Sequence, residues 1–374
     1  MTPYRTAVFR LEMSGPGDVS GLLNLCCSGT LDPAHIVAIL GKTEGNGGVN
    51  DFTREYSCAA FAAALSPLLG TDPEGVDRRI AMVMSGGTEG VLSPHATVFA
   101  RVPLDQPSAP DGTKRLAIGV AATRDFEPWE IGRRPQIEAT AEAVRAAMRG
   151  AGIAAAEDVH WVQIKCPLLT ADRVQAAKRA GHEVVTDTAY KSMGYSRGAS
   201  ALGVALAIGE IDAAIEDAAV LTDWSLASGV ASSSAGIELD NNIVVALGNS
   251  AHAAGDLVIG HAVMRDAIDA SGVLAALQDA GLGSPDNPLG FDPGRVVNVL
   301  AKADPSPDGL VRGFRHIMLD DTDISATRHV RAAVGGLLAG LSGCPAIFVS
   351  GGAEHQGPPG GGPVAILARA LGRP

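Results

Sequence analysis

Residues 85–89 read SGGTE, and the same pattern, Ser-(Gly/Ala)-Gly-x-Glu, returns as SAGIE at 234–238 and as SGGAE at 350–354. An apolar run precedes each copy, at 80–84, 226–231 and 346–349. A recurring unit decides an architecture, because every copy folds alike and buries its apolar face against its neighbours. The pattern therefore predicts three similar structural units whose serines gather at one site with approximate three-fold symmetry.

A lysine and an arginine accompany every copy of the pattern, always in the order lysine, arginine, serine. Each lysine ends an apolar run, and the three are Lys42, Lys165 and Lys302. The arginines open stretches of small, helix-forming residues, and the first two are Arg54 and Arg197. The third is either Arg328, which follows a threonine as Arg54 does, or Arg331. We favour Arg331, because Ala-Ala-Val-Gly-Gly follows it much as Gly-Ala-Ser-Ala-Leu-Gly follows Arg197.

Each unit contains the same succession of expected elements. The first strands are expected at 6–10, 115–120 and 256–261, and the helices after them at 19–27, 136–149 and 271–280. The strand that ends at the lysine comes next, followed by a second helix at 51–69, 197–207 or 327–341 and the strand before the serine. Alternating helices and strands predict an α/β fold, with one mixed sheet per unit and helices on one face. We expect concatenated domains at 1–105, 110–250 and 255–374, packed around a pseudo-three-fold axis, with a linker or long surface loop at 103–114.

Composition and charge exclude several classes of function. The 374 residues carry a net charge of −12, so nucleic acid is not an expected partner, because phosphate backbones require a basic face. No apolar run approaches the ~20 residues of a membrane span, and no secretory signal layout opens the chain. Five cysteines without regular spacing indicate neither a disulfide framework nor a zinc site. We expect a cytoplasmic protein with no membrane partner.

The repeated residues suggest nucleophilic catalysis. A lysine serves as general base for a serine when burial and nearby cations lower its pKa, and the arginines supply such cations. Guanidinium groups also suit carbonyl oxygens or an oxyanion, and a glycine after each serine lets the backbone approach a ligand. Such a site fits a small, flat molecule with three hydrogen-bonding edges. The pattern leaves open which serine is the nucleophile, although Ala235 and the extra Ser232 and Ser233 set the second copy apart.

One segment stands outside the repeat. Residues 353–363 read AEHQGPPGGGP. Their glycines and prolines impose an irregular backbone whose free carbonyls can ligate a hard cation such as Mg²⁺ or Ca²⁺. A rigid surface loop is the alternative interpretation of the same composition.

Several long stretches resemble the cyanuric acid hydrolase/barbiturase family, and the resemblance extends over essentially the whole chain. The matching segments are GKTEGNGGVNDFTREY (41–56), VMSGGTEGVLSPH (83–95), QIKCPLL (163–169), GYSRGASALG (194–203), SSSAGIE (232–238) and VSGGAEHQGPPGGGP (349–363). They are closer to cyanuric acid hydrolases than to barbiturases. The resemblance implies three concatenated domains around one site, opening of a cyclic amide without a catalytic cofactor, and a homotetramer.

The resemblance also implies roles for individual residues. Ser234 would be the nucleophile and Lys165 its base. Substrate would be bound by Arg54, Ser85, Gly86, Arg197, Ala235, Arg331, Ser350 and Gly351. Lys42 and Lys302 would orient the flanking serines, and the ring edge that distinguishes the family's two substrates would lie near Thr327. A structural Mg²⁺ or Ca²⁺ would be held by Ala353, Gln356, Gly357, Pro358, Gly361 and Asp304, the last standing where the family pattern has a glutamate.

The expected activity is hydrolysis of cyanuric acid by a Ser–Lys mechanism to carboxybiuret, which then gives biuret and CO₂. A barbiturase, which opens the ring of barbituric acid, is the nearest alternative. An alternative of a different class is a protein that binds flat heterocycles without turning them over. A purely structural scaffold, which would bind neither ring, is the most remote one.

Overall fold

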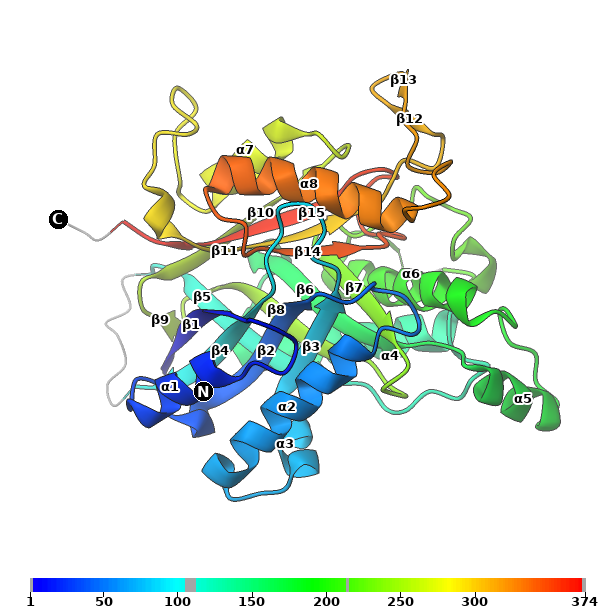
Figure 1. Ribbon diagram of the computed structural model, residues 1–374, viewed down its shortest axis with the longest axis horizontal. Coiled ribbons are helices and arrows are strands. Elements are labelled where there is room, and N and C mark those ends of the chain that lie inside the picture. Colours follow the sequence, from blue (N-terminus) through cyan, green and yellow to red (C-terminus); the bar gives the residue numbers. More distant parts are fainter. Residues whose placement is uncertain (1–2, 105–111, 213–214, 372–374) are drawn as a thin grey trace.

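Three sheets, each covered by helices on its outer side, make up the molecule (Figure 1). The computed structural model describes residues 3–104, 112–212 and 215–371, so most of the linker expected at 103–114 lies outside the described residues. Within those ranges, no helix is long and apolar enough to cross a membrane. The α/β class predicted from the sequence is confirmed.

The three units are defined here by their sheets. The first unit has strands β1 (Tyr4–Glu12), β2 (Ile36–Thr43), β3 (Ala81–Gly86) and β4 (His95–Pro103), with helices α1 (Ser20–Cys27), α2 (Phe52–Leu69) and α3 (Pro73–Arg79). The second has β5 (Arg115–Ala122), β6 (Val159–Pro167), β7 (Ala231–Gly236) and β8 (Ile243–Ser250), with α4 (Arg134–Ala151), α5 (Ala171–Arg179) and α6 (Ala189–Ile208). The third has β10 (Leu257–Met264), β11 (Val296–Ala303), β14 (Phe348–Gly351) and β15 (Gly362–Arg369), with α7 (Ala270–Asp279) and α8 (Ala326–Ser342).

Short elements complete the chain. A 3₁₀ turn precedes the second strand of every unit: η1 (Pro33–His35), η2 (Ala156–Asp158) and η4 (Pro293–Arg295). The others are η3 (Asp217–Ala219), β9 (Ala253–Ala254), and the hairpin of β12 (Leu310–Val311) and β13 (Phe314–Arg315). β9 follows the second unit but pairs in parallel with β1, so it ties the end of the second unit to the first sheet.

All three units have the same strand order. It is β3-β2-β4-β1, then β7-β6-β8-β5, then β14-β11-β15-β10. The lysine strand and the serine strand run parallel in each unit, whereas the other pairs within the four-strand sets are antiparallel. Parallel neighbours need a crossover connection, and α2, α6 and α8 lie in these crossovers.

The sheets share one core. The inner face of each sheet contributes to a common apolar cluster that includes Phe99, Trp161 and Phe348, one residue from each unit. The outer face of each sheet packs against that unit's own helices in a separate cluster. Strands buried on both faces read as continuous apolar runs, which is the pattern seen before the lysines and serines. Burial of both faces also fixes the strand register, since a slip of one residue would exchange the two faces.

Two predicted element bounds were wrong. The strand expected at 226–231 begins only at Ala231, because the backbone of Ser228 pairs with the glycine- and proline-rich segment: Ser228 N donates to His355 O, and Gly357 N donates to Ser228 O. The helix expected at 197–207 begins earlier, at Ala189. Small residues let this helix pack closely on α4, and a Cβ on Gly203 would lie 2.7 Å from the carbonyl oxygen of Ile137.

Candidate active site

Each lysine lies directly beside its serine on the neighbouring parallel strand. The paired positions are Lys42 with Ser85, Lys165 with Ser234, and Lys302 with Ser350. All six side chains are buried. The sequence shows their order along the chain and predicts a shared site, and the parallel strands bring each lysine and serine together at one end of their sheet.

The flanking pairs are joined by hydrogen bonds. Nζ of Lys42 donates to Oγ of Ser85 over 3.1 Å and to the Gly86 carbonyl over 3.0 Å. Nζ of Lys302 donates to Oγ of Ser350 over 3.2 Å and to the next carbonyl over 3.0 Å. Burial and the nearby Arg331 guanidinium hold the pKa of Lys42 well below its usual range. Burial and Arg197 lower the pKa of Lys302 to about 7. These two lysines therefore sit in surroundings that oppose their charge.

The pair in the second unit has different partners. Nζ of Lys165 lies 2.8 Å from Oε1 of Glu238. It also donates to the Met84 carbonyl over 3.2 Å, a contact that Lys302 repeats with the Ser233 carbonyl over 2.9 Å. The Ser234 hydroxyl lies 3.2 Å from that of Ser350, so the serines of the second and third units meet. The register is the same as in the other units, but the lysine is directed toward a carboxylate.

The arginines connect the units in a cycle. Arg54 of the first unit donates to the Ala235 carbonyl of the second over 3.0 Å. Arg197 of the second unit forms a two-bond pair with Glu354 of the third, at 2.7 and 2.5 Å. Arg331 of the third unit pairs in the same way with Glu89 of the first, at 2.8 and 2.6 Å. Every motif is thus completed by a guanidinium from another unit.

The structure places the two candidate arginines of the third unit differently. The Arg331 side chain is 3% exposed and occupies the position in the cycle described above. The Arg328 side chain is 47% exposed and reaches Glu89 only at 3.3 Å. Arg331 is therefore the counterpart of Arg54 and Arg197 in position.

Two glycines let the guanidinium groups lie against the backbone. Gly87 and Gly352 have φ of +105° and +74°, backbone angles that residues other than glycine rarely adopt. A Cβ on Gly87 would lie 2.5 Å from Arg331, and one on Gly352 would lie 2.6 Å from Arg197. In these two motifs the second glycine is required by the neighbouring arginine.

A cavity of about 940 Å³ opens beside the third motif, and the paired lysines and serines are not among the described residues that line it. Its lining comes from all three units and includes Gly47, Tyr190, Arg197, Thr327, Arg331 and Gly351. Thr327 packs tightly on Gly351, where a Cβ would lie 2.1 Å from its Cγ2. The predicted residues Arg197, Arg331, Thr327 and Gly351 are therefore brought to one wall, and a small ring fits in a space of this size.

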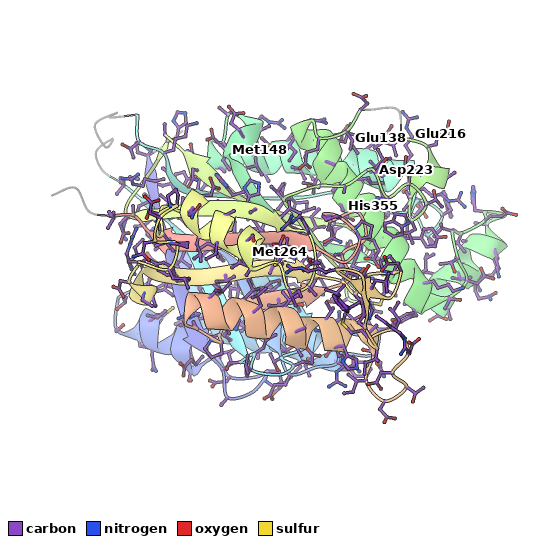
Figure 2. The ribbon with its side chains drawn as sticks, turned by 90° about the horizontal axis from the view of Figure 1, so that it is seen from above. Glu138, Met148, Glu216, Asp223, Met264 and His355 are labelled. Atoms are coloured by element: carbon purple, nitrogen blue, oxygen red, sulfur yellow. The ribbon has the colours of Figure 1, made fainter. Side chains whose placement is uncertain are left out.

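The glycine- and proline-rich segment is anchored to the second unit. Ring nitrogens of His355 accept from Leu221 N over 2.8 Å and donate to Leu226 O over 2.6 Å. The His355 ring stacks on the Trp224 ring, with 5.3 Å between the ring centroids. Asp223 lies near His355 (Figure 2). The side chain of Gln356 is also engaged, since Oε1 accepts from Ser233 N over 2.7 Å and Nε2 donates to two backbone carbonyls.

Among the predicted cation ligands, the Asp304 carboxylate accepts a hydrogen bond from the backbone of Ala353. Burial, followed by the charge of Glu354, raises the pKa of Asp304 to about 7, which indicates a carboxylate that lacks enough positive charge around it. The side chain of Gln356 is committed to backbone, so this residue would offer its carbonyl, as would Ala353, Gly357, Pro358 and Gly361. A buried carboxylate with several carbonyls is the donor set that Mg²⁺ and Ca²⁺ prefer, and the residues fit such an ion.

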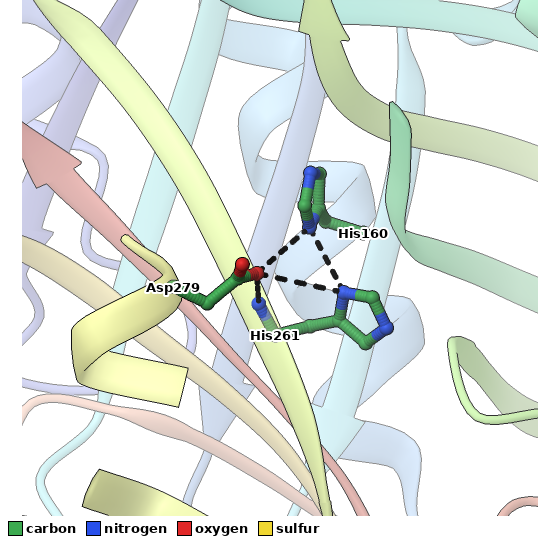
Figure 3. Close-up of side chains that lie close together, drawn as sticks. All are labelled: His160, His261 and Asp279. Carbon is green, nitrogen blue, oxygen red and sulfur yellow. Dashed lines mark hydrogen bonds and ion pairs between the residues drawn. The ribbon is translucent and has the colours of Figure 1, made fainter. Parts of the chain in front are cut away.

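A second group of potential metal ligands lies where the second and third units meet (Figure 3). Nδ1 of His160 is 2.9 Å from Nδ1 of His261 and 3.4 Å from Oδ2 of Asp279. The Asn249 amide exchanges two hydrogen bonds with the Ile259 backbone, so its Nδ2 donates to Nε2 of His160 at 3.0 Å. Neutral His160 then carries its proton on Nδ1, between the other two side chains. Because that nitrogen has no free lone pair, we interpret the group as a hydrogen-bonded joint between units.

Sequence reasoning assigned no role to the three glutamates that end the motifs. Glu89 and Glu354 hold arginines, and Glu238 holds the lysine of the second unit. The signal was present in the sequence, since the fifth position of the pattern is glutamate in all three copies. What the sequence could not show is that one glutamate differs from the other two in its partner.

Comparison with known proteins relates this geometry to a family. The family described as amidohydrolase ring-opening protein matches residues 7–369. The cyanuric acid amidohydrolase of Bradyrhizobium diazoefficiens is 62% identical over 370 residues, 99% of each chain. That of Pseudomonas sp. strain ADP is 55% identical over 368 residues, 98% of this chain and 100% of the relative. A solved cyanuric acid hydrolase, described as an innovation by structural concatenation, has a TM-score of 0.93 at 55% identity, covering 98% of this chain and 100% of that chain. The cyanuric acid hydrolase from A. caulinodans has a TM-score of 0.90 at 47% identity, with 99% and 100% covered.

Proposed function

This chain belongs to the family of ring-opening amidohydrolases, and on that premise we propose that it hydrolyses cyanuric acid. One observation carries the proposal: three lysine–serine pairs at the same register, with buried arginines between them, beside one cavity. Cyanuric acid has three equivalent carbonyl edges separated by three N–H groups. A pseudo-three-fold set of hydroxyl, amide and guanidinium groups is complementary to such a ring.

The mechanism proposed for the reaction uses Ser234 as nucleophile and Lys165 as base. Oγ of Ser234 forms a bond to a ring carbonyl carbon, and its proton passes to Nζ of Lys165. The carbonyl oxygen becomes an oxyanion that arginine and backbone donors stabilise. When the ring C–N bond breaks, the leaving nitrogen takes the proton from Lys165. Water then cleaves the acyl-enzyme to release carboxybiuret, which loses CO₂ to give biuret.

The other predicted residues would bind and orient the ring. Ser85 and Ser350, with the amides of Gly86 and Gly351, would hold the two carbonyl edges that do not react. Lys42 and Lys302 donate to these serines and would keep their hydroxyls in place. Arg54, Arg197 and Arg331 surround the motifs from the neighbouring units, and the amide of Ala235 would serve the reacting edge.

Barbituric acid is the second candidate substrate, because it differs from cyanuric acid by one CH₂ group in place of a ring N–H. Thr327 lines the cavity against Gly351 and would contact the edge where the two rings differ. A preference for cyanuric acid is supported by the relatives at 50–62% identity, which are cyanuric acid amidohydrolases.

Three further properties belong to the same proposal. A structural Mg²⁺ or Ca²⁺ held by Asp304 and the carbonyls of 353–361 would offset the adjacent carboxylate charges and brace the segment that carries Glu354. It would take no part in the chemistry. We also propose a cytoplasmic homotetramer, which the family resemblance suggests.

The test is steady-state hydrolysis of cyanuric acid and barbituric acid, side by side, by the wild-type protein and Ser234→Ala. Turnover of cyanuric acid that is lost in the variant supports both substrate and nucleophile. Turnover of barbituric acid alone would identify the sister activity. Binding of either ring by calorimetry without turnover would overturn the proposal in favour of a binding protein.

A further inference from the structure

The glutamates that end the motifs have two kinds of partner. Glu89 and Glu354 each form a two-bond pair with an arginine of another unit, whereas Glu238 lies 2.8 Å from the ammonium of Lys165. The cycle of contacts places Arg54 where the third such arginine belongs. Arg54 nevertheless donates to three backbone carbonyls, at 3.4, 3.0 and 2.8 Å, so its guanidinium holds main chain rather than a carboxylate.

The backbone of the second motif differs in the same place. Gly87 and Gly352 have positive φ, and an arginine packs over each of them, but Gly236 does not have positive φ. A Cβ on Gly236 would lie 2.1 Å from a carboxylate oxygen of Glu238. The turn of the second motif is therefore folded so that its own glutamate occupies the place that an arginine takes in the other two. Because Gly236 has no side chain, the turn can also adopt the conformation of Gly87 and Gly352.

Glu238 remains an anion between two cations. Burial opposes its charge, yet Lys165 and then Arg54 hold its pKa at about 2. Arg54 is thus close enough to act on Glu238 through its charge while its hydrogen bonds go elsewhere. One of those bonds is to the carbonyl of Ala235, in the same turn as Glu238.

We propose that Glu238 is a positioning residue that changes partner during the reaction. It holds Lys165 in the free enzyme and moves to Arg54 when the ring binds, which releases Lys165 to act as the base for Ser234. After the exchange, Glu238 and Arg54 would form the two-bond pair that Glu89 and Glu354 already make with their arginines. This inference rests on the proposed function and explains why the lysine of the second unit contacts a carboxylate whereas the lysines of the other two units donate to their serines.

The exchange balances in protons. The ammonium of Lys165 loses its carboxylate partner in a buried site and releases one proton to solvent. The resulting amine takes the proton of Ser234 as Oγ bonds to the ring carbon, and later gives that proton to the leaving ring nitrogen. Glu238 stays ionised throughout and Arg54 stays protonated, so neither supplies nor consumes a proton.

Few charged groups face this lysine. Glu238 comes from the turn after β7, and Arg54 comes from α2. Two thiols are also near, and burial raises the pKa of Cys58 on α2 to about 12 and raises that of Cys166 on β6 as well, so both are neutral at the pH of the reaction. Lys302, whose pKa burial and Arg197 lower to about 7, lies on the other side of Ser234 and donates to the Ser233 carbonyl and to Ser350. Since Glu238 contacts Lys165, removal of its charge should act first on Lys165.

The first experiment is the pH profile of kcat/KM for cyanuric acid with wild-type enzyme, Glu238→Gln and the matched control Glu89→Gln. Loss of the Glu238 charge destabilises the ammonium of Lys165, so the base form appears at lower pH. We expect the acidic limb of Glu238→Gln to move down by about one pH unit or more, with a plateau roughly tenfold lower. Glu89→Gln, at the same position of the first motif, should lower the plateau of kcat/KM and leave the pH of the acidic limb unchanged.

The second experiment is a structure of Ser234→Ala with cyanuric acid bound. The expected result is a two-bond contact between Glu238 and Arg54, with Lys165 released. A bound ring with Glu238 still on Lys165 would overturn the exchange. So would an acidic limb in Glu238→Gln that coincides with the wild-type limb, because a merely structural glutamate would lower activity at all pH values.

These measurements distinguish a failure of the Glu238 exchange from a failure of the proposed function. If the wild-type enzyme opens the ring but neither the limb nor the contact changes, only the exchange falls. If the wild-type enzyme does not open the ring, the proposed function falls, and the exchange falls with it.

Discussion

The first and second units present a lysine and a serine at the same register, but the two lysines have different surroundings. Lys42 donates to Ser85 and faces His95 on the antiparallel strand, whereas Lys165 contacts Glu238 and faces Ile243. A three-fold repeat of backbone therefore does not impose three-fold chemistry. In the proposed mechanism, the partner of one carboxylate separates the pair that reacts from the two pairs that bind the ring.

The sharpest test of this difference compares serines. Ser234→Ala should lower kcat by about 10³-fold or more, because the nucleophile is lost. Ser85→Ala removes one hydrogen bond to the ring and should lower kcat/KM by about 10- to 100-fold. Steady-state kinetics on cyanuric acid measures both, with circular dichroism to verify folding. Equal losses in the two variants would mean that the two units are chemically equivalent after all.

The arginine pairs should give the next largest effect. Arg331→Met removes the two-bond partner of Glu89, whose side chain is 10% exposed, and should reduce the free energy of unfolding by about 3 kcal/mol. Arg328→Met removes a half-exposed neighbour on the same helix and should change it by less than about 0.5 kcal/mol. Urea denaturation of the two variants provides the comparison. A similar loss from both would show that Glu89 does not depend on the buried guanidinium.

The histidine of the first unit should make stability depend on pH. Burial lowers the pKa of His95 to about 4, and its Nε2 has no hydrogen-bond partner among the described residues. The folded state keeps His95 neutral, whereas the unfolded chain takes up a proton below about pH 6.5. This contribution to stability is therefore complete above about pH 6.5 and is lost as the pH falls toward 4. The gap between the two pKa values corresponds to roughly 3 kcal/mol.

The variant His95→Ile copies the second unit at this position and tests that dependence. Its free energy of unfolding should fall less steeply than that of the wild type between pH 6.5 and 4.5, measured by urea denaturation at several pH values. His35, in the exposed turn η1, provides a histidine variant as control. An unchanged slope in His95→Ile would assign the acid sensitivity to other groups.

The smallest effect concerns the residue after the serine, which is glycine in two motifs and Ala235 in the second. Gly351→Ala would force a Cβ to within 2.1 Å of Cγ2 of Thr327 and should destabilise the protein by about 1–2 kcal/mol. Adding Thr327→Ser removes that methyl group and should restore most of the loss. Thermal unfolding of the single and double variants, with KM for both rings, measures this. A double variant no better than the single one would place the strain elsewhere.

Much of the fold could be predicted because each copy of the repeat has a local sequence pattern that indicates its strands. The apolar runs before Lys42, Lys165 and Lys302 and before the three serines are strands buried on both faces, so their pattern reveals them directly. The strand expected at 226–231 begins only at Ala231, because the backbone of Leu226 and Ser228 hydrogen-bonds to the segment around His355, a contact across more than a hundred residues. Local pattern carries no information about such a partner.

In the candidate site, too, the residues that the local sequence reveals differ from the contacts that only the tertiary structure shows. Residue types and their order indicated lysine, arginine and serine, and similarity to Arg197 favoured Arg331 over Arg328, in agreement with its burial. The partners of the glutamates could not be read in this way. Glu89, Glu238 and Glu354 occupy identical places in the pattern, and only the conformation of Gly236 and the reach of Arg54 distinguish the second from the others.

The cycle of arginines also bears on how the protein is made. Glu89 is synthesised early, but its guanidinium partner, Arg331, comes from the last part of the chain. In a ribosome-bound fragment with only the first two sheets, the Glu89 carboxylate would lack that cation and face solvent, so the first motif is completed only when the third unit docks. The cycle has no intrinsic starting point, however. A circular permutant opened between the second and third units would keep every arginine contact and change only the order in which the contacts form.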